Sequence, residues 1–210
     1  MHVAVIVGAA VIGALAGWAI VHDLRALSYR RPDERDLPTR TWHRWLPAIT
    51  GTGAALVATT GSWERLILAV PLLTIGVWLA GVDADVKRLP YRQVIALTVV
   101  QAFAVAGVTL ATQNLRGALV GLLGAVVAYL AFRVLHHFAQ GDLGYGDVTL
   151  APPLALAVTT AGGPALAWAW LLISLTAAAI HGLATRSEHA HRPLGPWLIA
   201  GAIVVMGFPG

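Results

Sequence analysis

The stretch AVPLLTIGVWLAGVDADVKRLP, residues 69–90, decides the fold class of this chain. Its first part, Ala69–Val82, contains no charged residue, and apolar residues precede it. A helix that crosses a membrane needs about 20 predominantly apolar residues. The stretch therefore predicts a transmembrane helix that ends at a carboxylate, Asp83. Carboxylates beside or within a membrane span are costly, and they usually mark a functional site.

The composition extends this interpretation to the whole chain. Of its 210 residues, 58% are hydrophobic and 11% are charged, and the mean hydropathy is +0.73. A soluble domain has about 25% charged residues. We therefore expect an all-α, polytopic transmembrane helical bundle that forms a single integral-membrane domain over residues 1–210. The chain has no cysteine, which excludes disulfides and thiolate metal sites.

Eight apolar runs are candidate spans, and a count of six to eight spans fits the pattern. The first run has no basic residue before it and no Ala-x-Ala-like cleavage site after it, so we expect a retained span rather than a signal peptide. Glycines thin the second run, and Pro152-Pro153 interrupts the sixth. The runs are 3–21, 46–61, 64–82, 92–112, 115–135, 148–161, 163–184 and 194–208.

The basic residues alternate sharply between successive connections. Successive connections fall into two alternating sets, and one set holds nearly all the basic residues. Of the 14 Lys and Arg residues, only Arg65 and Arg116 lie outside this set. Because an excess of Lys and Arg marks the cytoplasmic side, we expect the N-terminus outside. Asp83 and Asp147 then both lie on the cytoplasmic side of the membrane.

A second segment of interest is Gly144-Tyr145-Gly146-Asp147, directly before another apolar run. Glycines let a substrate backbone approach closely, although an aspartate after a glycine-rich turn is also a common helix N-cap. Asp83 alone is equally compatible with an ordinary loop acid near Lys87 and Arg88. Together, however, two carboxylates can hydrolyse a peptide, because neighbouring carboxyl groups do not both ionise readily and so supply one base and one acid.

The other titratable residues are weaker candidates. Asp85 points to a different helix face from Asp83, and we expect both Asp85 and Asp142 to be solvated loop acids. The adjacent His136 and His137 face different directions, and His189-Ala190-His191 is more typical of a loop than of a metal site. We therefore expect no metal and no organic cofactor.

These segments together resemble the type IV prepilin peptidases. Asp83 followed by Leu89-Pro90 resembles the first catalytic segment of that family, and Gly144–Val148 resembles its Gly-x-Gly-Asp signature. The segment His191–Trp197 is similar to the family's terminal Pro-Phe-Gly-Pro-Phe segment, and Val11–Tyr29 more loosely resembles its opening span. The matching segments follow the family order over nearly the whole chain.

The resemblance implies an intramembrane aspartyl endopeptidase of the bacterial cytoplasmic membrane. Such an enzyme removes the short basic leader of pilin-like precursors during pilus assembly or secretion, with Asp83 and Asp147 as the catalytic pair and Gly144 and Gly146 as supporting backbone. The chain lacks the four-cysteine zinc module of many members. It also has Thr149 where members often have Lys, and Tyr91 where they often have Asn or Asp.

Two other functions fit the same sequence. A proton-coupled transporter would use the acids as a relay, but it would place them deep in several spans rather than at cytoplasmic ends. A non-catalytic assembly partner of a pilus or secretion system would keep the fold without the activity. Incubation of the purified protein with a pilin-like precursor separates these alternatives.

Overall fold

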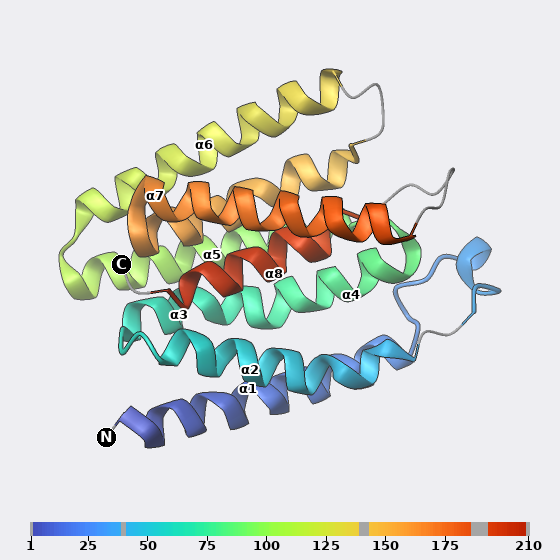
Figure 1. Cartoon of the computed structure of the whole chain (residues 1–210), viewed down its shortest axis with the longest axis horizontal. Coiled ribbons are helices and arrows are strands. Elements are labelled where there is room, and N and C mark those ends of the chain that lie inside the picture. Colours follow the sequence, from blue (N-terminus) through green and yellow to red (C-terminus); the bar gives the residue numbers. More distant parts are fainter. Residues whose placement is uncertain (1, 39–40, 139–142, 186–192, 209–210) are drawn as a thin grey trace.

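The computed structural model describes residues 2–38, 41–138, 143–185 and 193–208, and these ranges are helices joined by short connections, with no strand. The all-α prediction is therefore confirmed for the described chain (Figure 1). The elements, in chain order, are α1 (His2–Arg25), η1 (Pro32–Glu34), η2 (Trp42–Trp45), α2 (Leu46–Ala58), α3 (Trp63–Pro71), η3 (Leu72–Gly76), α4 (Val77–Val86), α5 (Tyr91–Thr112), α6 (Leu115–Phe138), α7 (Tyr145–Thr185) and α8 (Gly195–Met206).

Five helical stretches in the described ranges are long and apolar enough to cross a membrane: Val3–Arg25, Trp63–Val86, Tyr91–Thr112, Leu115–Phe138 and Tyr145–Ala184. The predicted count of eight spans is not confirmed. The difference comes partly from α2 and α8, which have 13 and 12 residues, well short of the length of about 20 residues that a bilayer requires.

The remaining difference lies in α7, which is not one straight helix. Its backbone leaves helical geometry at Gly162 and Gly163, and Gly163 has φ 71° and ψ −167°, a conformation that is essentially restricted to glycine. Figure 1 shows that α7 runs to one end of the bundle and returns. The predicted break between residues 161 and 163 is therefore present, whereas the helix continues through Pro152-Pro153.

The span that leads to Asp83 is built from α3, η3 and α4 in direct succession. Pro71 has no backbone N–H and cannot complete the α-helical hydrogen-bond ladder. The π-helical turn Leu72–Gly76 follows it, and the chain then resumes an α-helix that continues to Val86. This adjustment allows one apolar stretch to reach from Trp63 to the last turn of α4.

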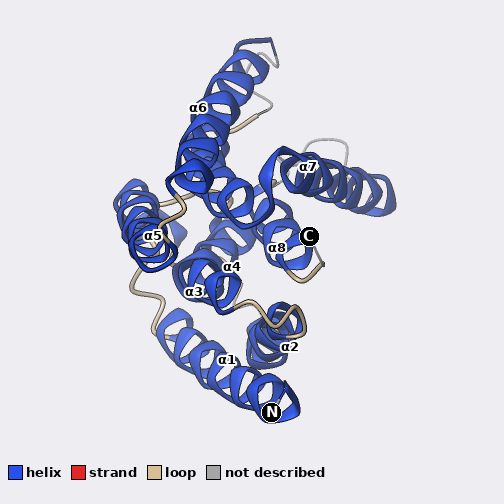
Figure 2. Ribbon diagram, turned by 90° about the vertical axis from the view of Figure 1, so that its left-hand side faces the viewer, coloured by secondary structure: helices blue, strands red, loops and turns tan. Residues whose placement is uncertain are grey.

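The short helix α8 lies in the interior of the bundle (Figure 2). Leu198, Ala202 and Val205 are completely buried, and the indole Nε1 of Trp170 in α7 donates to the carbonyl oxygen of Leu198 at 2.8 Å. Burial of most of its residues explains why α8 is apolar throughout although it is short. Its first residue, Gly195, is consequently held inside the bundle.

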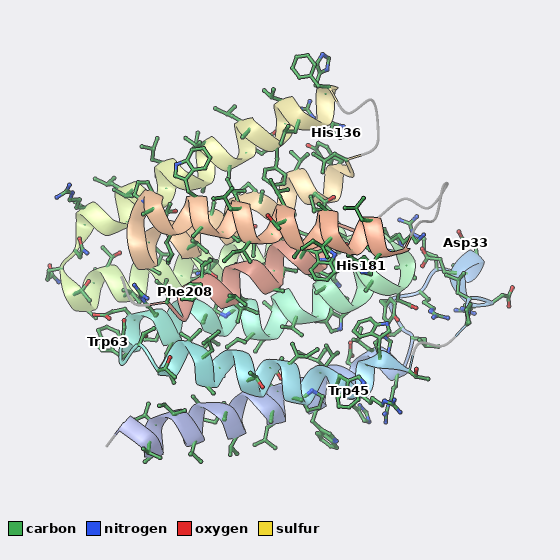
Figure 3. The ribbon with its side chains drawn as sticks, in the orientation of Figure 1. Asp33, Trp45, Trp63, His136, His181 and Phe208 are labelled. Carbon is green, nitrogen blue, oxygen red and sulfur yellow. The ribbon has the colours of Figure 1, made fainter. Side chains whose placement is uncertain are left out.

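The connections gather at two opposite ends of the bundle. Figure 3 shows Asp33, His136 and His181 toward one end, and Trp63 and Phe208 toward the other. The end that carries Asp33 also holds the α4–α5 connection and the start of α7 (Figure 1). The described parts of the alternate connections that the sequence assigns to one side of a membrane therefore lie at the same end of the bundle.

Candidate active site

Asp83 lies in the last full turn of α4 and is 5% exposed. The helix ends at Val86, one residue after Asp85, because Lys87 adopts a left-handed conformation with φ 53°. The Lys87 N–H donates to the carbonyl oxygen of Asp83 at 2.9 Å, and the following Leu89-Pro90 leads directly into α5. Asp83 is thus a buried carboxylate at the point where the chain reverses direction.

Asp147 lies in the first turn of α7 and is 7% exposed. Its backbone N–H donates to the carbonyl oxygen of Gly144 at 3.1 Å, which closes the glycine turn before the helix. The hydroxyl of Thr149, two residues onward, donates to the carbonyl oxygen of Gly146 at 2.9 Å. The Gly144–Asp147 segment is therefore an ordered helix start that turns its carboxylate inward.

The two carboxylates share one pocket of about 240 Å³ at the basic end of the bundle. The segments that carry them are far apart in the chain, and each of the two Gly-x-Gly glycines also borders the pocket. Its lining consists of Asp83, Lys87, Arg88, Leu89, Gly144, Tyr145, Gly146, Asp147 and Pro193. The structure therefore brings Asp83, Asp147, Gly144 and Gly146 together, as the sequence predicts.

Two glycines allow the segments around the pocket to approach one another closely. A Cβ atom at Gly146 would lie 3.0 Å from the Cβ of Leu89, so the glycine of the second segment packs against the leucine of the first. A Cβ atom at Gly195 would lie 2.7 Å from Oδ2 of Asp83. The carboxyl group of Asp83 also interacts with the backbone N–H of Gly195, so the first residue of α8 packs directly against the site.

Asp85 does not lie where the sequence predicts. It is 3% exposed, and its Oδ2 accepts from Nε of Arg30 at 2.8 Å while its Oδ1 accepts from Nη2 of Arg30 at 2.9 Å. The hydroxyl of Tyr29 also donates to Oδ2 at 2.7 Å. The expectation of a solvated loop acid is wrong because residues that follow α1 cover this face of α4 and bind Asp85 through Tyr29 and Arg30. The two aspartates do leave different faces of the helix, which rotates about 100° per residue. Asp85 consequently faces away from Asp83 and toward the exit of α1.

A second ion pair joins the same two regions. Arg88 donates through Nε to Oε1 of Glu34 at 2.6 Å and through Nη2 to Oε2 at 2.8 Å. This pairing lowers the pKa of Glu34 to about 2. Burial, followed by the bond to Asp85, raises the pKa of Tyr29 to about 12. The loop after α1 is therefore fastened by charge to the α4–α5 connection beside the pocket.

Of the remaining candidates, His136 and His137 are described, and neither lines the pocket of the two aspartates. Nδ1 of His136 lies 2.7 Å from the carbonyl oxygen of Leu143, and its ring contacts that of Tyr145 edge-on with a centroid separation of 5.8 Å. The described residues that line a larger hollow of about 540 Å³ beside His136 and His137 include no carboxylate. The described residues contain no cluster of three or more His, Asp or Glu side chains placed to hold a metal ion. Asp142, His189 and His191 lie outside the described residues.

Comparisons with protein-family models, with curated proteins and with solved structures found no match to this chain. The resemblance to the prepilin peptidases therefore stays a prediction that rests on the sequence segments. Three of the four segments that carry the resemblance contribute to the pocket, since Leu89, Gly146 and Pro193 all line it.

Proposed function

We propose that this protein is an intramembrane aspartyl endopeptidase that removes the basic leader of pilin-like precursors. The observation that supports the proposal is the shared pocket, in which Asp83 and Asp147 are both buried and both border the same space. Buried carboxylates without a cationic partner are costly. A pair of buried carboxylates beside glycine backbone is typical of a site that binds and hydrolyses a peptide bond.

The proposed reaction needs only these two carboxyl groups and water. One carboxylate takes a proton from water as the water oxygen attacks the scissile carbonyl carbon. The other, protonated carboxyl group donates a hydrogen bond to the carbonyl oxygen and stabilises the charge that develops there. When the C–N bond breaks, the leaving amine takes a proton from a carboxyl group, and the pair regains its single shared proton.

We also propose that the site faces the cytoplasm of a bacterial cell, with the N-terminus outside. The connections around the pocket hold most of the described Lys and Arg residues, whereas only Arg65 and Arg116 lie at or near the other end. An excess of basic residues favours the cytoplasmic side. A precursor would then present its leader at this face, with its apolar segment in the membrane beside the enzyme.

The distribution of acids favours hydrolysis over proton transport. The buried carboxylates among the described residues are Asp83, Asp85 and Asp147, and all three lie at one end of the bundle. A proton relay requires titratable groups that follow a path across the membrane. The described interior offers no such series of acids.

Cleavage of a pilin-like precursor by the purified protein tests the proposal. We expect Asp83→Asn and Asp147→Asn each to abolish cleavage, and the double variant to be little worse than either, because groups that act as a unit are not additive. Asp36→Asn is the matched control, because it removes an exposed carboxylate at the same end. A protein that binds the precursor without cleaving it would be an assembly partner, and cleavage by Asp147→Asn would exclude the aspartyl mechanism.

A further inference from the structure

The proposed mechanism does not use the buried ion pair between Arg30 and Asp85. Both side chains are completely shielded from solvent, and the two groups are joined by two hydrogen bonds of 2.8 and 2.9 Å. A buried ion pair seldom adds much to stability, because desolvation offsets the attraction between the charges. Its position beside a functional pocket therefore needs another explanation.

The guanidinium of Arg30 organises the loop that follows α1. Its Nη1 donates to the carbonyl oxygen of Leu37 at 2.7 Å, and its Nη2 donates to that of Pro38 at 3.2 Å. The chain from residue 30 to residue 38 is thus closed around the side chain of its own first residue. A planar fork of donors suits this task, whereas the ammonium of lysine lacks the fixed geometry.

Asp85 connects this ordered loop to the helical turn that carries Asp83. The two aspartates are two residues apart in α4, so their side chains leave nearly opposite sides of the same turn. The helix ends at Val86, and no further helical turn fixes the rotation of this last one. Arg30 and Tyr29 hold the outer side of the turn through Asp85. A rotation that released Asp85 would carry Asp83 away from Asp147.

We infer that Arg30, Tyr29 and Asp85 are positioning residues that hold Asp83 in its place within the pocket. The inference rests on the proposed function, because it assigns a role within the same reaction. It gives the loop after α1 a role in catalysis, although no described residue of that loop lines the pocket. In this inference the loop acts on Asp83 through the ion pair on the far side of α4.

Steady-state kinetics of precursor cleavage tests the inference with graded variants. Tyr29→Phe removes one hydrogen bond to Asp85 and keeps the ring beside Trp78, so we expect kcat to fall about fivefold with little change in KM. Arg30→Lys keeps the positive charge but loses the planar, forked set of N–H donors. We therefore expect kcat to fall further than in Tyr29→Phe. Asp85→Asn should lower kcat by about a hundredfold, since small displacements of a catalytic group have effects of this size.

The matched control is Asp23→Asn. Asp23 also joins α1 to α4, because its Oδ2 accepts from Nε1 of Trp78 at 2.6 Å, but it is exposed and acts on an earlier turn of the helix. We expect wild-type kcat for this variant. Melting curves of every variant separate an effect on the site from a loss of folded protein, and Tyr29→Phe should melt with the wild type.

Wild-type kcat in both Tyr29→Phe and Arg30→Lys, together with an inactive Asp83→Asn, would overturn the inference and leave the proposed function intact. A fall in kcat that only follows the fraction of folded protein would overturn it as well. An active Asp83→Asn variant would instead remove the proposed function, and the inference with it.

Discussion

The carboxylate of Asp83 lies against a backbone position that has no side chain. Because a Cβ atom at Gly195 would lie 2.7 Å from Oδ2 of Asp83 and 3.6 Å from Cδ2 of Leu150, an alanine there must displace the carboxylate. We expect Gly195→Ala to fold, since alanine favours a helix by up to about 1 kcal/mol over glycine. Cleavage should nevertheless fall by about a hundredfold.

The control for this substitution is Gly107→Ala in α5, where a Cβ atom would meet nothing within 4 Å. Precursor cleavage and melting temperature should be measured for both variants. Equal activity in Gly195→Ala and the wild type would show that the close contact with Asp83 is not needed for catalysis.

At the same scale, the sequence predicted some site residues and missed others for a physical reason. Asp83 and Asp147 are visible because each interrupts or borders an apolar run, where a carboxylate is costly. The partner of Asp85 is Arg30, 55 positions earlier in the chain. No local pattern contains this pairing, and only the packing of α1 against α4 brings the two residues together.

Among the elements, α7 depends on one backbone conformation. Gly163 has φ 71° and ψ −167° where the helix reverses, and a side chain there adds strain of about 1–3 kcal/mol. We expect Gly163→Ala to lower the free energy of unfolding by that amount in a denaturation experiment, whereas Gly107→Ala should not. Since a Cβ at Gly163 would meet no atom within 4 Å, a neutral result would mean that the backbone relaxes freely at the reversal.

The loop after α1 should respond to acid through its second ion pair. The pKa of Glu34 is lowered from 4.5 to about 2 by Arg88, so the pairing stabilises the folded loop fully above pH 4.5. This contribution declines as the pH falls below 4.5, and it is lost near pH 2. Spin labels on Asp36→Cys and Arg92→Cys should therefore give a distance distribution that broadens over this range.

Glu34→Gln should give the broader distribution already at pH 6, because the amide carries no charge to pair with Arg88. Glu64→Gln, which removes an acid near the other end of the bundle, serves as the control and should behave as the wild type does. A distribution in Glu34→Gln that matches the wild type at pH 6 would show that Arg30 alone holds the loop.

The elements also show where hydropathy stops being informative. It located the apolar runs because each long helix presents apolar residues to lipid or to its neighbours. It did not separate spans from short buried helices, since α8 is as apolar as a span although it has only 12 residues, most of them buried within the bundle. A run of apolar residues indicates burial, and only the length of the run distinguishes burial in lipid from burial in protein.

For the whole molecule, the arrangement of the connections carries the proposed orientation in a membrane. The pocket, the Arg30–Asp85 pair and the Arg88–Glu34 pair all lie at the end that holds most of the basic residues. The chain has no cysteine, so single cysteines report on each side without background. Asp36→Cys and Tyr91→Cys mark the basic end, and Thr59→Cys and Gln113→Cys mark the opposite end; all four positions are exposed.

On intact cells we expect an impermeant thiol reagent to label Thr59→Cys and Gln113→Cys, because basic connections are retained in the cytoplasm. Asp36→Cys and Tyr91→Cys should be labelled only after the membrane is permeabilised. Labelling in the reverse sense would place the pocket outside the cell. The pocket would then be unable to meet a leader peptide that has not left the cytoplasm, so the proposed substrate would be excluded although the carboxylate pair remained.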